Sequence, residues 1–292
     1  MESQGIVSVV IPAFNRVNFI DQTVTSVVSQ SYSYVETIVV DDGSTDGTWE
    51  RLDDLRQKHG IKVLTHEGRE NRGQSAALNL GLQEAIGEYI AILDSDDLFA
   101  PGKLKKQVRF LEENPTVGLV YGMGQAIDGD GQYLYDILCP DHLEPNDPNE
   151  VLLDCYFLLP QNALVRRSVF DRVGEFEESF RAAQDHDMLI RIAEVTTMAF
   201  IPETLFYYRR HGDSISSNGQ ELRWRNGFEI LRRAAKRYPY RRSTIRKRAA
   251  VLNYRLWETY SGQGQRGRAW SHLIWAGLLD PARSVRVLLG WE

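Results

Sequence analysis

The chain has 292 residues, of which 42% are hydrophobic and 25% are charged, and its net charge is −6. This length allows one large domain, or one domain with an appendage, and the composition is that of a globular protein. Two cysteines exclude a disulfide framework, residues 1–5 lack the features of a signal peptide, and no apolar run approaches the ~18–20 residues of a membrane span. We therefore expect a cytoplasmic protein.

The charge is distributed unevenly along the chain. Residues 222–292 hold 16 Lys and Arg against four Asp and Glu, a net charge of +12, whereas residues 1–221 hold 18 against 36, a net charge of −18. Five of the six tryptophans also lie in the basic segment. This shift in composition predicts two regions, residues 1–220 and residues 221–292.

Short apolar runs alternate with stretches of helical spacing as far as residue 121. We expect strands at residues 7–11, 35–40, 61–64, 89–93 and 117–121. Between them we expect helices at residues 19–28, 49–55 and 71–85, and a fourth whose first turn contains Pro101. This alternation predicts an α/β fold with a mostly parallel sheet that helices cover on both faces.

The pattern changes beyond residue 121. Residues 126–134 are typical of a hairpin around an Asp-Gly turn, and residues 141–150 of a loop. A helix is expected to begin near Asp185. After residue 220 we expect three or four helices, with breaks at Pro239, residues 262–267 and Pro281.

Three carboxylates, Asp94, Asp96 and Asp97, follow the apolar run of residues 89–93. Carboxylates at the end of a buried strand would lie at the carboxyl edge of the sheet, where open α/β folds bind ligands. Their mutual repulsion favours a compensating divalent cation. The alternatives are a simple helix cap and an aspartyl phosphatase; Leu98 does not fit the phosphatase pattern.

Two further acidic clusters are candidates for chemistry. Residues 42–53 have the ligand spacing of an EF-hand loop, but a strand precedes them and Asp53 replaces the usual Glu, so we reject a calcium loop. Gln184-Asp185-His186-Asp187 lies at an expected helix start. Spacing alone leaves Asp185 equally suited to cap the helix or to act as a general base.

Several short motifs occur together in the chain. In order they are Val-Ile-Pro-Ala-Phe-Asn-Arg (10–16), Val-Val-Asp-Asp-Gly-Ser-Thr-Asp (39–46), Asn-Arg-Gly (71–73) with Ala-Ala-Leu-Asn (76–79), Asp-x-Asp (94–96), Gly-x-Phe (174–176) and Gln-Asp (184–185). Their order and spacing resemble those of the family-2 glycosyltransferases, over roughly residues 5–215. The resemblance implies a GT-A, Rossmann-like fold, a nucleotide-sugar donor, Mg²⁺ or Mn²⁺, and inversion at the anomeric carbon.

The resemblance also implies a role for each matching position. Asp185 matches the catalytic base, although this chain has Gln184 where the family usually has Glu. Asp96 and His211 match positions at the metal and diphosphate. The positions expected to bind the nucleotide sugar are Pro12, Ala13, Asn15, Asp41, Asp42, Asn71, Gly73, Asp94 and Ser95. Arg209 and Arg210 are equally consistent with phosphate binding and with ordinary surface charge.

The expected partners follow from this resemblance. They are a nucleotide sugar, with a UDP-sugar favoured, and a glycan or lipid-linked acceptor in the synthesis of cell-surface glycans. Residues 222–292 are expected to be a helical appendage whose tryptophans pack on the catalytic region or a peripheral contact with the inner face of a membrane. A contact with a protein partner is the third alternative. Nucleic acid is not favoured. The alternative functions are a non-catalytic nucleotide-sugar-binding relative and a nucleotidyltransferase.

Overall fold

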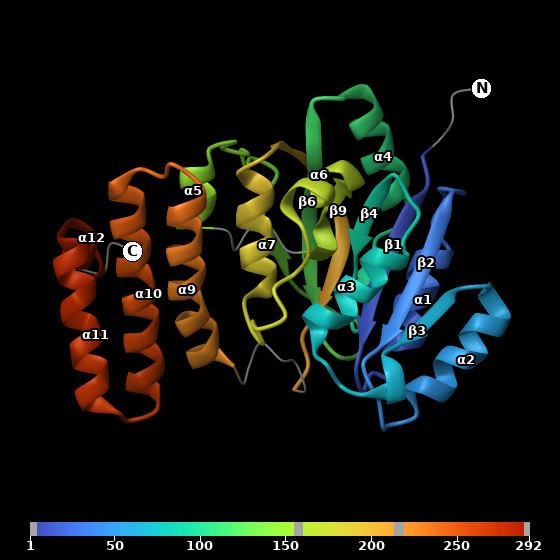
Figure 1. Ribbon diagram of the computed structural model, residues 1–292, viewed down its shortest axis with the longest axis horizontal. Helices are drawn as coiled ribbons and strands as arrows, with labels where there is room; N and C mark the ends of the chain where they lie inside the picture. The colour runs from blue at the N-terminus through green and yellow to red at the C-terminus, as the bar shows by residue number, and fades with distance from the viewer. Residues whose placement is uncertain (1–4, 155–159, 213–218, 289–292) are drawn as a thin grey trace. The chain divides into compact units, whose positions relative to one another are not determined.

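The computed structural model describes residues 5–154, 160–212 and 219–288, which divide into two compact units (Figure 1). The first unit takes the described residues of ranges 1–144 and 156–212, and the second those of ranges 145–155 and 213–292. The elements of the first unit are β1 (Val7–Ala13), α1 (Ile20–Val28), β2 (Val35–Asp41), α2 (Thr48–His59), β3 (Lys62–Thr65), η1 (Glu67–Arg69), α3 (Gln74–Glu84), β4 (Tyr89–Ile92), β5 (Leu98–Phe99), α4 (Lys103–Glu113), β6 (Val117–Ile127), β7 (Tyr133–Ile137), η2 (Pro160–Asn162), β8 (Leu164–Arg166), α6 (Arg167–Val173), α7 (Gln184–Ala193) and β9 (Thr197–Arg209).

The described strands form one nine-stranded sheet in the order β3-β2-β1-β4-β8-β6-β9-β5, and β7 pairs with β6 off this path. Strands β3, β2, β1 and β4 are parallel, as predicted. The rest of the sheet is mixed, because β8 runs antiparallel to both β4 and β6 while β9 is parallel to β6. The antiparallel pairings involve strands from the part of the chain where the regular alternation of strands and helices has stopped.

Strands β1 and β4 and the second half of β2 are buried on both faces, which explains their continuous apolar runs. On β2, Val39 packs in the same core as Ile20 of α1 and Leu52 of α2. Its neighbours Ile38 and Val40 pack on the opposite side with Ala77 of α3. This period of two is that of a strand between two helical layers, and it confirms the prediction of helices on both faces.

The register of the parallel strands brings three chain segments to one edge. Ala13 at the end of β1 lies beside Asp41 at the end of β2, and Val10 of β1 lies beside Ile92 at the end of β4. The residues that follow these strands therefore meet at the carboxyl edge of the sheet.

Three helix boundaries differ from the sequence prediction. Helix α3 begins at Gln74 rather than near residue 71, and α4 begins at Lys103 after a turn that contains Pro101. In each case a glycine with a left-handed backbone precedes the helix, Gly73 with φ 91° and Gly102 with φ 75°, and this conformation does not continue into a helix. The segment expected to be a loop up to residue 150 contains the start of α5 (Pro148–Leu153).

The second unit is helical and consists of α5 with α9 (Gln220–Arg237), α10 (Arg242–Gly262), α11 (Arg266–Leu279) and α12 (Pro281–Leu288). The described residues from 220 onward form four helices, within the predicted three or four, and their ends agree with the predicted breaks. Leu256, Tyr260 and Ala269 form its core, and Trp224 and Trp257 pack against it. None of the described helices has the length and apolar character needed to cross a bilayer.

Candidate active site

The loops after β1 and β2 hold each other by hydrogen bonds at the sheet edge. Asn15 has a left-handed backbone, with φ 53°. Its N–H donates to Ser44 Oγ over 2.9 Å, and its side-chain Oδ1 accepts the Thr45 N–H over 2.8 Å. Asn, a residue that tolerates this conformation, therefore fixes the geometry of both loops.

Asp42 connects this edge to the loop before α3. Its two oxygens accept the backbone N–H groups of Arg72 and Gly73, each over 2.8 Å, and its side chain is buried. The structure therefore brings Asp42 and the Asn71–Gly73 segment together. Gly73 has φ 91°, a backbone conformation that residues with a side chain rarely adopt, so this turn needs the conformational freedom of glycine.

Asp41 is fully buried beside this contact. Its Oδ2 accepts the Ser44 N–H over 3.2 Å and lies 3.6 Å from the Arg69 guanidinium. Its Oδ1 has no hydrogen-bond partner among the described residues. A buried acceptor without a donor costs free energy. Because Asp41 has no exposed surface, contact of its carboxylate with a nucleotide sugar remains a prediction.

Asp94 is held by two glutamine amides. Gln74 donates to its Oδ1 over 2.9 Å, and Gln161 donates to its Oδ2 over 2.8 Å. Burial, then the nearby charges of Asp96 and Asp185, raise the pKa of Asp94 to about 7. Neutral amides can support the carboxyl group here but cannot cancel its charge.

Asp97 turns into the protein interior. It has no exposed surface, and its oxygens accept the Arg209 N–H over 2.7 Å and the Gln161 amide over 2.5 Å. Burial, with the charges of Asp96 and Asp94, raises the pKa of Asp97 well above its usual value. Asp97 therefore braces the strand end and does not face a ligand.

Asp96 meets His211, which comes from the segment after β9. His211 Nε2 lies 3.0 Å from Asp96 Oδ2, and the His211 ring packs on Phe19 with centroids 4.6 Å apart. Arg16 Nε donates to the same Asp96 oxygen over 3.2 Å. The structure thus brings Asp96 and His211 together with a cation, Arg16.

Arg209 is a buried structural residue and not a surface charge. Its guanidinium donates to the carbonyl oxygens of Asp96 and Gly129, over 3.0 and 2.8 Å, and to Gln22 Oε1 over 2.7 Å. Arg210 is exposed and donates to the Tyr135 hydroxyl over 2.8 Å. Arg209 therefore ties the acidic strand end to α1 and to the β6–β7 hairpin.

Asp185 lies in the first turn of α7. The residue at the N-cap position is Ala183, with φ 63°, and no side chain caps this helix, so Asp185 is not its cap. Its side chain is 25% exposed, whereas that of Asp187 is buried and paired with Arg191 over 2.8 Å. Of the two carboxylates, Asp185 is the one that reaches solvent.

Gln184 joins α7 to the acidic strand end. Its amide donates to Gln74 Oε1 over 2.7 Å, and Gln74 in turn donates to Asp94. Gln74 was not singled out from the sequence, although it follows directly on the Asn71–Gly73 motif. No site role for Gln161 follows from the sequence either. Gln74 and Gln161 share one feature, a neutral amide that hydrogen-bonds to Asp94. Only the fold shows this, because it brings distant segments of the chain together.

The chemistry of Asp96 and His211 fits a divalent metal whose remaining ligands come from a substrate. The described residues contain no group of three or more His, Cys, Asp or Glu side chains arranged around a metal ion. Mg²⁺ is commonly held by one or two carboxylates together with substrate phosphates and water, and Mn²⁺ accepts a similar oxygen-rich set. His211 Nδ1 is buried without a partner among the described residues, so this ring is not fixed by a second hydrogen bond.

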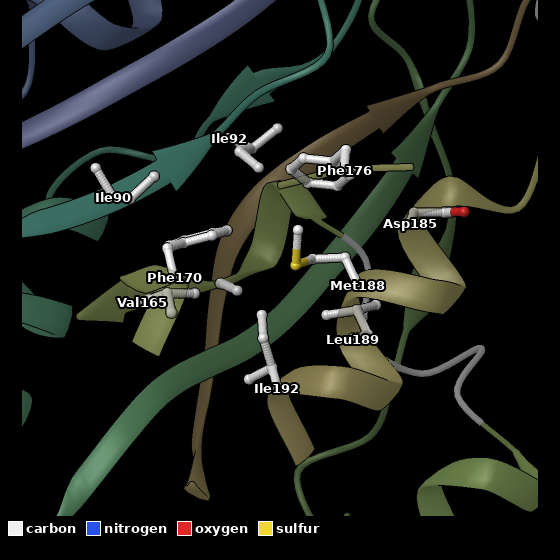
Figure 2. A pocket seen from close by; sticks show the side chains of 10 residues that line it. Ile90, Ile92, Val165, Phe170, Phe176, Asp185, Met188, Leu189 and Ile192 are labelled. Atoms are coloured by element: carbon white, nitrogen blue, oxygen red, sulfur yellow. The ribbon is translucent and has the colours of Figure 1, made fainter. Parts of the chain in front are cut away.

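A small apolar cavity lies beneath α7, lined by residues such as Ile92, Phe170 and Met188. Figure 2 shows Asp185 at its edge, with the carboxylate directed away from the apolar side chains. An apolar cavity of this kind does not suit a charged diphosphate. It is a packing void behind the helix that carries Asp185.

The remaining predicted positions lie within the same edge of the sheet. Pro12 and Ala13 are buried residues of β1, and the Ala13 carbonyl accepts the Asp42 N–H over 2.8 Å. Ser95 is buried, and its carbonyl accepts the Thr23 hydroxyl over 3.0 Å. Binding of a nucleotide sugar by these residues remains a prediction.

Known proteins similar to this chain are glycosyltransferases. An uncharacterized glycosyltransferase of Haemophilus influenzae is 30% identical over 227 residues, which cover 74% of this chain and 69% of that protein. One of Rickettsia bellii is 32% identical over 208 residues, covering 71% of this chain and 29% of that protein. The chain thus spans about a third of the length of the Rickettsia bellii relative.

The family model "Glycosyl transferase family 2" matches residues 8–174. This stretch is more than half of the chain and contains most of the motifs quoted above. The chain belongs to glycosyl transferase family 2.

Solved structures agree with this assignment at the level of the fold. S. aureus TarS 1–349 in complex with UDP-GlcNAc has a TM-score of 0.70 at 18% identity, covering 96% of this chain and 82% of that one. Mannosyltransferase PcManGT from Pyrobaculum calidifontis, in complex with GDP-Man and Mn²⁺, has a TM-score of 0.65 at 19% identity, covering 98% and 81%. The expected GT-A fold is confirmed.

Proposed function

We propose that this protein is an inverting, metal-dependent glycosyltransferase that moves a sugar from a nucleotide-sugar donor to an acceptor hydroxyl. Asp96 contacts His211 at the same edge of the sheet where the charge of Asp185 contributes to the raised pKa of Asp94. This arrangement is the observation that carries the proposal. A metal-binding pair and a solvent-accessible carboxylate are the two groups that such a transfer needs.

The donor's nucleotide would bind at the ends of β1 and β2. Asp42 and Asn15 fix the loops there by hydrogen bonds, and Asp41 lies buried beside them. We favour a UDP-sugar. TarS in complex with UDP-GlcNAc and PcManGT in complex with GDP-Man and Mn²⁺ support a nucleotide sugar as the donor class, on a fold shared with this chain.

In the transfer, Asp185 accepts the proton of the acceptor hydroxyl while that oxygen forms a bond to the anomeric carbon. The bond from this carbon to the diphosphate breaks, and its electron pair leaves with the diphosphate. Attack from the face opposite the leaving group inverts the anomeric configuration. A metal held by Asp96 and His211 would supply positive charge to the diphosphate. Asp94 and its two glutamines would orient the donor beside them.

The acceptor in this proposal is a hydroxyl of a glycan or of a lipid-linked saccharide, in the synthesis of cell-surface glycans. The site itself argues only for a hydroxyl, because a single general base at Asp185 matches one proton to be removed. A lipid-linked acceptor would be reached most readily by an enzyme bound to a membrane surface.

A donor screen tests the proposal. Thermal shift is measured with a panel of nucleotide sugars, with and without Mn²⁺, and product formation is then followed for any donor that stabilises the protein. We expect Asp185→Asn to keep the donor's thermal shift and to lose transfer by about 100-fold or more. Asp96→Asn should lose the Mn²⁺-dependent part of the shift. Asp54→Asn, an exposed carboxylate on α2, is the matched control.

Other outcomes distinguish the alternatives. A thermal shift without any product would indicate a nucleotide-sugar-binding relative. Turnover of a nucleoside triphosphate with a sugar phosphate would indicate a nucleotidyltransferase. Near-normal transfer by Asp185→Asn would show that another group is the base.

A further inference from the structure

Helix α11 exposes large apolar side chains to solvent. Trp270 is 63% exposed, Ile274 58%, Trp275 58% and Leu278 68%. Most large apolar side chains among the described residues are buried, and these four belong to one helix of fourteen residues.

The four side chains form one continuous surface. Trp270, Ile274 and Leu278 are spaced four residues apart, and Trp275 lies three residues before Leu278, so each is adjacent to the next on the helix. The opposite face carries the small residues Ala269 and Ala276, which are buried.

The buried face packs toward α10, where His272 Nδ1 lies 2.9 Å from Asn253 Oδ1 and stacks on Tyr260. In Figure 1, α11 lies beside α10, on the side away from α9. A surface helix of a globular protein normally buries its large apolar residues, whereas α11 exposes four of them.

The charges around this surface are positive. Arg266 lies four residues before Trp270 and Arg268 seven before Trp275, so each extends one edge of the apolar surface, and both are exposed. Helix α11 contains no Asp or Glu. Helix α12 adds exposed Arg283 and Arg286, while the intervening Asp280 is buried and its Oδ1 accepts the Arg283 N–H.

We propose that the outer face of α11 lies in the surface of an anionic lipid bilayer. Ile274 and Leu278 would enter the boundary of the acyl chains, and the two tryptophans would lie at the headgroup level, where indole rings are favoured. The arginines on α11 and α12 would contact lipid phosphates. This inference concerns the second unit and does not depend on the proposed transferase reaction.

A second copy of the chain fits this surface less well. Four partly exposed side chains present a few hundred Å², below the ~800 Å² per partner that a stable interface buries. A symmetric contact would also bring the basic edges of two α11 helices together without an acid on that helix to compensate them. An anionic bilayer can contact the apolar side chains with its acyl chains and the arginines with its phosphates.

Co-sedimentation of the full chain with vesicles tests the proposal. Phosphatidylcholine vesicles are compared with vesicles that also contain phosphatidylglycerol, at low and high salt. We expect binding to the anionic vesicles that weakens with salt, and an approximately tenfold or greater loss of binding in the double variant Trp270→Ser, Trp275→Ser. Arg266→Gln with Arg268→Gln should reduce the preference for anionic lipid.

The controls keep the test independent of folding. Ile86→Ser with Tyr133→Ser removes two exposed apolar side chains of the first unit and should leave binding unchanged. Ile274→Ser with Leu278→Ser should weaken binding as the tryptophan variant does, and circular dichroism checks that each variant is folded. Absence of binding to anionic vesicles, or unchanged binding by both α11 variants, would overturn the proposal. So would a dimer in light scattering that the tryptophan variant dissociates.

Discussion

At the scale of single residues, three aspartates close together in sequence meet three different environments. Asp94 is held by the amides of Gln74 and Gln161, Asp96 lies against His211 and Arg16, and Asp97 is enclosed beneath the backbone of Arg209. The turn after β4 sends their side chains in different directions. Only Asp96 combines partial exposure with a neighbouring imidazole, so it is the strongest candidate for a metal ligand.

Asp94 predicts how the stability of the metal-free protein depends on pH. Its pKa is raised from 3.8 to about 7, chiefly by burial and then by Asp96 and Asp185. Between about pH 4 and pH 7 the folded protein keeps a proton that the unfolded chain has released, so the free energy of unfolding falls as the pH rises through this window.

We expect Asp94→Asn to reduce this dependence, because the amide has no proton to lose. Asp97, whose pKa is raised in the same direction, should leave a residual slope. The measurement is the melting temperature between pH 4.5 and pH 8 in the presence of a chelator, with exposed Asp130→Asn as the control. An Asp94→Asn slope equal to that of the wild type would contradict the assignment.

At the scale of elements, α4 supports the segment that carries Gln161. Lys103 is fully buried at the start of α4, where its ammonium contacts Gln107 Oε1 and the Ala163 carbonyl. Gln107 donates to the carbonyl oxygens of Val120 and Asn162, over 3.1 and 2.9 Å. This network holds η2 against β6 and so fixes the position from which Gln161 reaches Asp94 and Asp97.

Replacement of Lys103 by methionine should stabilise the protein at low pH. Burial lowers the pKa of Lys103 well below its usual value, so below the usual lysine pKa the unfolded chain binds this proton more readily than the folded protein does. Stability therefore rises with pH in the wild type. Lys103→Met removes the free-energy cost of releasing this proton on folding. It also removes one hydrogen-bond partner of Gln107.

The expected difference in melting temperature between Lys103→Met and the wild type is greatest near pH 6 and shrinks toward pH 10. Melting curves across this range provide the measurement. If Lys103→Met instead lowered the melting temperature by the same amount at every pH, Lys103 would be protonated in the folded protein and would stabilise it as a cation.

At the scale of the whole molecule, the helical unit is assembled from two parts of the chain. Helix α5 belongs with the helices after residue 219: Asn149 Oδ1 accepts the Arg241 N–H over 3.0 Å, and Arg248 donates to the Leu153 carbonyl over 3.0 Å. Val151 and Leu152 of α5 are each 1% exposed. We therefore propose that the catalytic region, drawn from the sequence as residues 1–220, is interrupted by a segment of the helical unit.

Truncation of the chain after residue 220 should leave α5 without the helix that it contacts. Exposure of Val151 and Leu152 alone removes roughly 1.5–3 kcal/mol of burial per side chain. We expect the truncated protein to melt at lower temperature and to bind a hydrophobic dye, both measured against the full chain. A monodisperse truncated protein with an unchanged melting temperature would show that α5 needs no partner from the C-terminal helices.

Much of this molecule follows from local patterns. The strands of the parallel half were predicted from short continuous apolar runs, and the helices between them from apolar residues at helical spacing. Three or four C-terminal helices were expected from stretches that bear Arg and Trp, separated by breaks at Pro and Gly. The helix starts at Gln74 and Lys103 were missed because they depend on the left-handed backbone of Gly73 and Gly102.

The sequence by itself determined the family, the order of strands and helices, and the list of acidic candidates, because these depend on residues near one another in the chain. The tertiary structure decided which candidates meet. The contacts of Gln161 with Asp94, of Asp96 with His211 and of Arg209 with Gln22 join residues 67, 115 and 187 positions apart. It also decided which side of α11 faces outward. Such outcomes depend on how whole elements pack, and no local window of sequence contains that information.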